Sequence, residues 1–238
     1  ILEFIMISPS MAKFIGLLPN KLVSFLANRI INGYVSKYAN IKVENLENLN
    51  NVSTPVVFIC NHLSNSDGLV LNRVLKDFDV TFVAGVKLSD NSLTKLGIDV
   101  VKTTPLHPNS PDKEGLKRII NIANEGKNVL IFPEGTRSRT GKMIKGKKGI
   151  VLIAKKCNIP IVPIGITGTE KLLPINMEGK MEQEKFHHAD INVKIGEQFT
   201  LPARLEGESK KEYDERAMEM IMNNIAELLP DEYKGEYL

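Results

Sequence analysis

Short apolar runs alternate with amphipathic segments from residue 55 onward. A continuous apolar run is typical of a strand buried on both faces, whereas apolar residues spaced three and four apart indicate a helix. The apolar runs predict strands at 56–60, 80–84, 98–101, 129–132, 161–166 and 191–195. The amphipathic segments predict helices at 66–76, 110–125, 149–157 and 209–229. This alternation predicts an α/β fold in which helices cover both faces of one sheet.

Cap residues indicate the ends of the second predicted helix. Ser110 is a favoured N-cap, and Pro111 suits the first helical position because an N–H has no helical partner there. Gly126 is expected to end the helix, because glycine readily adopts the left-handed conformation that follows a last helical turn.

The first 38 residues carry a different pattern, with apolar residues at helical spacing on both sides of Pro19. They predict two short amphipathic helices, and no apolar stretch reaches the roughly 18 residues of a spanning helix. The segment 4–43 has no acidic residue and five basic ones: Lys13, Lys21, Arg29, Lys37 and Lys42. Such helices either cap the core or lie on an anionic membrane surface. We expect residues 1–38 to be membrane-docking helices.

Composition and charge narrow the range of partners. Hydrophobic residues make up 42% of the chain and charged residues 25%, which excludes collagen-like, low-complexity and fully disordered chains. The net charge of +3 is too small by itself to indicate a nucleic-acid partner. Residues 1–169 carry 22 basic and 12 acidic side chains, however, and residues 170–238 carry 9 and 16. The N-terminal part is therefore expected to contact something anionic.

The segment 61–68 places an imidazole and a carboxylate directly after a predicted strand. In open α/β sheets, ligands bind at the carboxyl ends of the strands, where this loop is expected to lie. Asp67 could fix the tautomer of His62 and leave the other ring nitrogen as a base near neutral pH. The alternative is that Asp67 only caps the following helix and that His62 is an ordinary loop histidine.

A second polar segment, Phe132-Pro133-Glu134-Gly135-Thr136-Arg137-Ser138, follows another predicted strand. The planar guanidinium of Arg137 suits a phosphate, and Gly135 allows close approach of the backbone. Residues 135–169 include eight basic side chains and no acidic one. Because a carboxylate repels a phosphate, Glu134 is expected to hold Arg137 or a substrate hydroxyl. The alternative is a solvated basic loop without a ligand.

Several other reaction centres are disfavoured. The segment 141–147 has the glycine and lysine spacing of a P-loop, but Lys148 stands where a Mg²⁺-binding Ser or Thr belongs. No cysteine pair has zinc spacing, and no G-x-S-x-G elbow is present. Cys60 and Cys157 both lie beside apolar runs, so we expect two buried, reduced thiols and no disulfide scaffold.

The pair of motifs, Asn61-His62 with Asp67 and then Phe-Pro-Glu-Gly-Thr-Arg-Ser, resembles the glycerolipid acyltransferase family. The resemblance covers roughly residues 40–200 and includes two further blocks, Lys87 to Gly97 with Val101 and Lys102, and Ile161-Val162-Pro163-Ile164. Many relatives carry arginine where this chain has Lys102, although a lysine can also meet a phosphate as a point charge. The resemblance implies a single mixed, largely parallel sheet.

The resemblance also implies a reaction. An acyl chain would pass from an acyl thioester, acyl-CoA or acyl carrier protein, to the sn-2 hydroxyl of 1-acyl-glycerol-3-phosphate, with no cofactor. His62 would be the general base, and Asp67 would orient it. The acceptor-binding residues would be Lys87, Lys102, Glu134, Gly135, Thr136 and Arg137. Residues 39–238 would form the acyltransferase domain, held peripherally on the cytoplasmic face of a bacterial membrane.

Two other functions fit parts of the sequence. A related acyltransferase would act on another lysolipid or hydroxyl acceptor. A non-enzymatic lipid-binding protein would use the basic surface alone. Lipid binding requires neither His62 nor Asp67, so the presence of both favours an enzyme.

Overall fold

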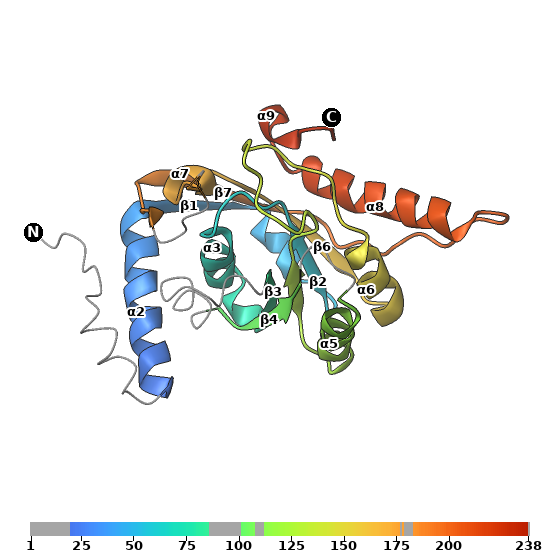
Figure 1. Ribbon diagram of the computed structural model, residues 1–238, viewed down its shortest axis with the longest axis horizontal. Coiled ribbons are helices and arrows are strands. Elements are labelled where there is room, and N and C mark those ends of the chain that lie inside the picture. Colours follow the sequence, from blue (N-terminus) through green and yellow to red (C-terminus); the bar gives the residue numbers. More distant parts are fainter. Residues whose placement is uncertain (1–19, 86–100, 108–111, 177, 179–182, 238) are drawn as a thin grey trace, which may run out of the picture.

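The computed structural model describes residues 20–85, 101–107, 112–176, 178 and 183–237. Its centre is a seven-stranded sheet in the order β1-β7-β6-β2-β5-β3-β4 (Figure 1). The strands are β1 (Ala39–Glu44), β2 (Val57–Cys60), β3 (Thr81–Gly85), β4 (Thr103–Leu106), β5 (Val129–Ile131), β6 (Ile161–Thr167) and β7 (Ala189–Ile195). The helices are α2 (Asn20–Tyr38), α3 (Asp67–Val74), α5 (Lys113–Asn124), α6 (Gly149–Cys157), α7 (Thr169–Leu172), α8 (Lys210–Ala226) and α9 (Asp231–Lys234), with short 3₁₀ helices η1 (Leu46–Leu49) and η2 (Lys76–Phe78).

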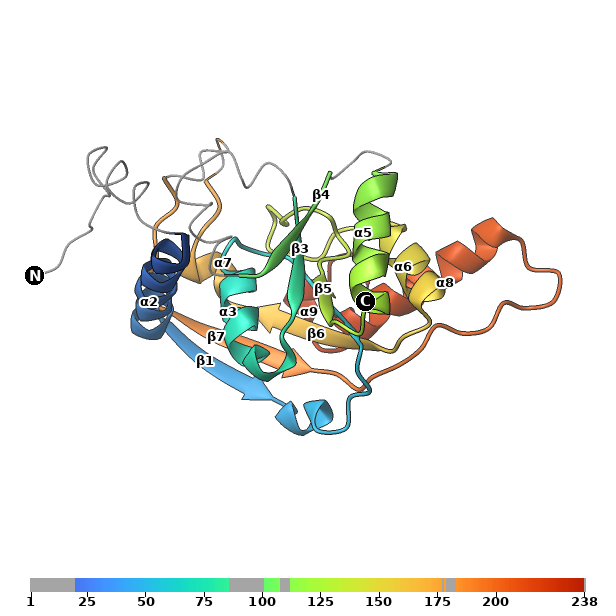
Figure 2. The same cartoon turned by 90° about the horizontal axis from the view of Figure 1, so that it is seen from below.

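The sheet is mixed and largely parallel, as predicted. β6, β2, β5, β3 and β4 run in one direction, whereas β7 is antiparallel to β6 and parallel to β1. Val57 of β2 pairs with Val129 of β5 on one side and with Ile161 of β6 on the other, so β2 lies inside the sheet. The carboxyl ends of these five strands meet at one edge, which is where ligands bind in such sheets (Figure 2).

Helices cover both faces of the sheet, as predicted (Figure 1). In β2, Phe58 and Cys60 point to the core that includes α3, while Val57 and Ile59 point to the core that includes α5, α6 and α8. All four side chains are fully buried. The continuous apolar run in the sequence follows from this two-sided burial.

The strand predicted at 98–101 is wrong at Val101, and residues 98–100 lie outside the described part of the chain. Val101 is buried, but the strand begins two residues later, at Thr103. This strand contains Pro105, which is tolerated because β4 lies at the edge of the sheet and has a partner on one side only. An apolar run indicates that its residues are buried. Val101 is buried without pairing to a neighbouring strand.

Helix α5 begins after Asp112, which is its N-cap in place of the predicted Ser110. Oδ1 of Asp112 accepts the backbone N–H of Gly115 at 2.8 Å. Ser110 and Pro111 lie outside the described residues. Gly126 follows the helix with a φ of 80°, as predicted for a glycine at a helix C-terminus.

Two smaller differences concern an edge strand and a cysteine. β1 was not predicted, because its apolar residues alternate with polar ones at the edge of the sheet. Cys60 is buried and free, as predicted. Cys157 is also free but partly exposed, because it is the last residue of α6.

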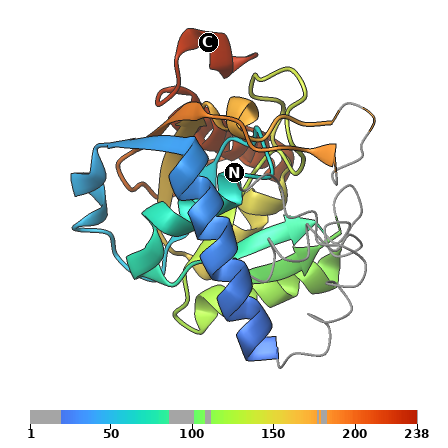
Figure 3. The ribbon, with the colours of Figure 1, turned by 90° about the vertical axis from the view of Figure 1, so that its left-hand side faces the viewer.

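Helix α2 is the second of the two predicted N-terminal helices, and the first falls in residues 1–19, outside the described residues (Figure 3). Ile31 and Tyr38 pack against the core, and Val35 between them is 1% exposed. Away from this packed face, Phe25 and Ile30 are 61% and 55% exposed. None of the described helices is both long and apolar enough to cross a membrane.

Candidate active site

His62 follows β2 at the carboxyl edge of the sheet, and its neighbour Asn61 fixes the start of the loop. The side-chain N–H of Asn61 donates to the carbonyl oxygen of Ile166 at 2.9 Å, and its Oδ1 accepts the N–H of Ile166 at 2.8 Å. Asn61 is fully buried, so these bonds are shielded from water. Its side chain therefore anchors the loop to β6 where the main-chain pairing of β2 ends.

The imidazole of His62 is paired with Asp67. Nδ1 of His62 lies 2.7 Å from Oδ2 of Asp67, a buried carboxylate oxygen that also accepts the N–H groups of Leu63 at 2.7 Å and Ser64 at 2.9 Å. An ionised carboxylate only accepts, so Nδ1 carries the proton and Nε2 is left as the basic nitrogen. The carboxylate faces back into the loop and makes no cap to α3, so the alternative of a simple helix cap is wrong.

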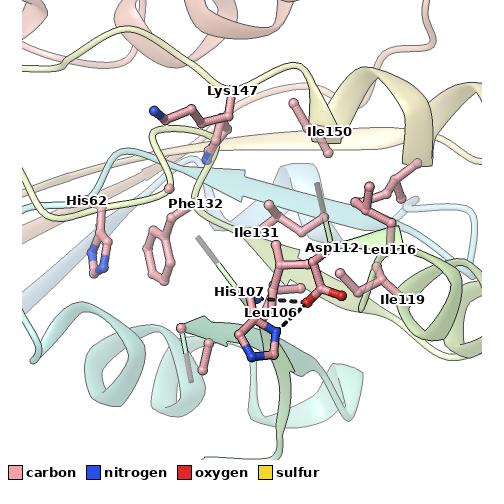
Figure 4. Close-up of a pocket in the computed structure, with 17 residues that line it drawn as sticks. His62, Leu106, His107, Asp112, Leu116, Ile119, Ile131, Phe132, Lys147 and Ile150 are labelled. Atoms are coloured by element: carbon pink, nitrogen blue, oxygen red, sulfur yellow. Dashed lines mark hydrogen bonds and ion pairs between the residues drawn. The ribbon is translucent and has the colours of Figure 1, made fainter. Parts of the chain in front are cut away.

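The ring of His62 is held from a second side by Phe132. The two rings are stacked, with centroids 4.0 Å apart and planes inclined by 15°. The His62 side chain is 19% exposed, and its ring lines a cavity (Figure 4). The imidazole thus has a fixed plane, a fixed tautomer and an open side.

Glu134 contacts the backbone of His62 and not Arg137, contrary to the prediction. Its Oε1 accepts the N–H of His62 at 2.8 Å, and its Oε2 accepts the N–H of Ile144 at 2.9 Å. The side chain is fully buried, and this burial raises the pKa of Glu134 to about 8. The nearby charge of Asp67 adds to the rise, while the two backbone donors oppose it. Glu134 therefore supports the two loops through their backbones.

Another residue of the segment 132–138 also holds the loop of His62. The N–H of Ser138 donates to the carbonyl oxygen of His62 at 2.7 Å. Gly135 has a φ of 68°, which favours glycine, and an added Cβ would lie 3.1 Å from Cγ of Lys147. Gly135 lines the cavity, and Thr136 is exposed beside it.

Arg137 forms an ion pair that the sequence pattern did not indicate. Its Nη1 donates to Oε1 of Glu184 at 2.8 Å. Oε2 of Glu184 accepts the side-chain N–H of Asn65 at 2.8 Å. Arg137 is 17% exposed and Glu184 only 2%. No local signal marks Glu184, because it lies 47 residues from Arg137 in a segment without a motif.

Of the two predicted lysines, only Lys102 lies in the described part of the chain. Lys87 lies outside the described residues. Lys102 directly precedes β4, so it lies at the amino end of the parallel strands, opposite the edge that carries His62. Its Nζ contacts Oδ2 of Asp79 at 2.8 Å. The expected contact of Lys102 with the site is therefore wrong, because a sequence motif does not show at which end of a strand a residue lies.

The cavity beside His62 has a volume of about 310 Å³ (Figure 4). It extends from His62 and Phe132 to the facing surfaces of α5 and α6. Its apolar wall includes Leu106, Leu116, Ile119, Ile131, Ile150 and Ile153. A cavity of this size, with an apolar wall and the imidazole of His62 beside it, suits an apolar ligand with a reactive end.

A second histidine–aspartate pair lines the same cavity. Nδ1 of His107 lies 2.9 Å from Oδ2 of Asp112, with the same spacing in sequence as His62 and Asp67. Hydrogen bonds from the N–H groups of His107 and Gly115 hold the pKa of Asp112 well below its usual range. The shared spacing was visible in the sequence. His107 is far more exposed than His62, at 60% against 19%.

Cys60 does not offer an alternative nucleophile. It is fully buried, and this burial raises the pKa of its thiol well above the usual value. The nearby charges of Asp67 and Glu134 raise it further. A thiol that stays protonated in the core is inert.

Comparisons with known proteins find similar chains. A family model described as Acyltransferase matches residues 40–167. The chloroplastic 1-acyl-sn-glycerol-3-phosphate acyltransferase of Brassica napus is 33% identical over 156 residues, which cover 64% of this chain and 43% of that protein. The 1-acyl-sn-glycerol-3-phosphate acyltransferase of Bacillus subtilis is 29% identical over 154 residues, which cover 63% of this chain and 76% of that protein. The chain thus spans less than half the length of the chloroplastic relative.

A solved structure shares the fold. It is the 1-acyl-sn-glycerophosphate acyltransferase PlsC from Thermotoga maritima, with a TM-score of 0.59 and 23% sequence identity. The match covers 92% of this chain and 87% of that chain.

Proposed function

Since the chain belongs to the acyltransferase family, we propose that it transfers an acyl chain from a thioester to the sn-2 hydroxyl of 1-acyl-glycerol-3-phosphate. The observation that carries this proposal is the 2.7 Å contact between His62 and a buried Asp67 at the rim of an apolar cavity. The names of the relatives from Brassica napus and Bacillus subtilis support the choice of acceptor.

His62 would act as the general base. Nε2 removes the proton from the acceptor hydroxyl, and the oxygen attacks the thioester carbonyl carbon. The carbon–sulfur bond then breaks, and the departing thiolate takes the proton from the imidazolium. Asp67 keeps its carboxylate on Nδ1 throughout and stabilises the imidazolium that forms between these steps. The reaction forms an ester and a free thiol, with no covalent enzyme intermediate.

The acyl chain of the donor would lie in the cavity. Its wall is apolar between α5 and α6, and burial of a methylene group contributes about 0.8 kcal/mol. With the chain in the cavity, the thioester would lie at the rim, beside His62. The headgroup of the donor, coenzyme A or the arm of acyl carrier protein, would stay outside.

The phosphate of the acceptor would bind Arg137. A guanidinium binds a phosphate through two parallel N–H donors, and the contact with Glu184 uses only one of the five donors of Arg137. Exposed Lys145, Lys147 and Lys148 follow in the same loop and add positive charge. The positive electrostatic potential of these side chains attracts anionic substrates.

Residues 1–38 would dock the protein on an anionic membrane, and residues 39–238 would form the acyltransferase domain. The support in the described part is the outer face of α2, where Leu22 is 42% and Phe25 61% exposed, with Arg29 exposed between Phe25 and Ile30. An apolar face with a basic rim favours the membrane interface. The protein would then be peripheral, on the cytoplasmic face of a bacterial membrane.

The test is an acceptor-dependent assay. Thiol release from palmitoyl-CoA is followed with and without 1-oleoyl-glycerol-3-phosphate, and the lipid product is identified by mass spectrometry. Palmitoyl-acyl carrier protein is tested as the second donor. Phosphatidate formed only with the acceptor present supports the proposal. Thiol release that ignores the acceptor, or transfer only to another lysolipid, contradicts it.

A further inference from the structure

The carboxylate of Glu184 connects the loop after β2 with the loop after β5. Its Oε2 accepts from the side chain of Asn65 and its Oε1 from Arg137, both at 2.8 Å. The backbone N–H of Asn176 also donates to Oε1, at 3.4 Å. Asn65 lies between His62 and Asp67 in the sequence. Glu184 itself precedes β7, so three separate parts of the chain meet at one side chain.

These contacts differ from an exposed ion pair. The Glu184 side chain is 2% exposed, so its charge is shielded from water. A buried carboxylate must keep its partners, because removal of one partner leaves an uncompensated charge. The two bonds therefore fix the guanidinium of Arg137 relative to Asn65, and Asn65 is part of the loop that carries His62.

We propose that Glu184 is a positioning residue that sets the distance between Arg137 and His62. The proposal rests on the proposed function, because it takes Arg137 as the ligand of the acceptor phosphate. In 1-acyl-glycerol-3-phosphate, the sn-2 hydroxyl is separated from the phosphate by a short chain of carbon and oxygen atoms. The guanidinium can therefore bind the phosphate while the imidazole contacts the hydroxyl only over a narrow range of distances between the two side chains. Small misplacements of reacting groups slow a reaction strongly.

Two substitutions distinguish the effect of the charge of Glu184 from the effect of its side-chain length. Glu184→Gln keeps the size of the side chain, but its single amide oxygen can replace only one of the two carboxylate oxygens that accept from Asn65 and Arg137. Glu184→Asp keeps the charge but is shorter by one methylene group. We expect each to raise the KM for the acceptor about five-fold, with the KM for the donor within about two-fold of wild type. If Glu184 only weakened the charge of Arg137, Glu184→Gln would lower the acceptor KM, and this result would overturn the proposal.

A matched control and a double variant test whether the effect passes through Arg137. Glu208→Gln removes a carboxylate that pairs with Arg216 at 2.8 and 2.9 Å and is 9% exposed, but it lies before α8. Its acceptor KM should match wild type. Glu184→Gln should add little to the acceptor KM of Arg137→Lys, because both changes act on one contact. Additive effects would overturn the proposal.

A binding measurement tests the role of Glu184 without turnover. The probe is 1-hexanoyl-glycerol-3-phosphate, titrated by calorimetry in the absence of a donor. Weaker binding by Glu184→Gln than by Glu208→Gln supports the proposal, and equal binding by Glu184→Gln and wild type overturns it. A wild-type protein that binds the probe but transfers no acyl chain contradicts the proposed function instead.

Discussion

Oε1 of Glu134 accepts the backbone N–H of His62 at 2.8 Å, so a buried carboxyl group in the loop after β5 holds the backbone of the loop after β2. The N–H of Ser138 donates to the carbonyl oxygen of the same histidine at 2.7 Å. His62 is therefore fixed through its main chain before its ring meets Asp67. The two motifs form one unit, in which the second supports the first.

Glu134→Gln should change how stability depends on pH. The pKa of Glu134 in the folded protein is about 8, above the ordinary value of 4.5, so the folded state retains a proton that the unfolded chain releases. Wild type is therefore most stable relative to the variant below pH 4.5 and loses this advantage as pH rises through 8. We expect a relative loss of about 1 kcal/mol or more in the free energy of unfolding between pH 5 and 8.5.

Chemical denaturation at several pH values measures this change. Glu215→Gln is the control, because Glu215 is 55% exposed, and its pH profile should follow wild type. Parallel profiles for wild type and Glu134→Gln would show that Glu134 titrates as an ordinary carboxyl.

Arg137→Lys should weaken acceptor binding selectively. Lysine keeps the charge but loses the planar fork, so the KM for the acceptor should rise about five-fold while the donor KM changes little. Arg139→Lys is the control, because Arg139 is exposed in the same loop, and its acceptor KM should stay within about two-fold of wild type. Kinetics with each substrate varied in turn distinguish these cases. A rise in donor KM alone would instead assign the loop to the phosphates of the donor.

Leu22→Ser with Phe25→Ser should reduce membrane binding. Both side chains are exposed on the outer face of α2, so their loss removes apolar contact with lipid and leaves the packed face intact. Co-sedimentation with vesicles that contain anionic lipid should fall about ten-fold or more. Leu205→Ser is the control, because Leu205 is 61% exposed in a loop before α8. Equal binding of wild type to neutral and anionic vesicles would show that the basic residues do not contribute to membrane binding.

Leu116→Trp should shorten the preferred acyl chain. Leu116 lies on α5 and lines the cavity, so a larger side chain there takes space from the end of a long chain. We expect the ratio of kcat/KM for palmitoyl-CoA over octanoyl-CoA to fall about 10-fold. Leu152→Trp on α6 is the control, because Leu152 is 40% exposed and does not line the cavity. An unchanged ratio in a folded Leu116→Trp variant would place the acyl chain elsewhere.

Local pattern predicted most of the fold. The apolar run before His62 and the helical pattern of 149–157 match β2 and α6. Burial on two faces leaves a continuous apolar run in the sequence, and burial of one helical stripe leaves a periodic pattern. β4 was misplaced because an edge strand with a proline leaves no such trace.

The site was predicted only in part. The spacing of His62 and Asp67 was enough to pair them, since one short loop joins His62 to the first residue of α3, Asp67. The partner of Glu134 was wrong, because charge favoured Arg137 while the direction of the buried side chain favours the backbone of His62. Glu184 left no signal, because its contacts arise only when distant segments pack together.

The measurement that tests the role of His62 most directly is the turnover of His62→Ala with palmitoyl-CoA and 1-oleoyl-glycerol-3-phosphate, alongside its melting curve. Loss of a general base lowers the rate about 100- to 10,000-fold, and we expect a loss in this range from a protein that still unfolds cooperatively. His107→Ala is the comparison. Its loss of turnover should be far smaller, because His107 is 60% exposed and its partner Asp112 has a structural role as the N-cap of α5. A folded His62→Ala variant that keeps more than about a tenth of wild-type turnover would contradict general-base catalysis by His62.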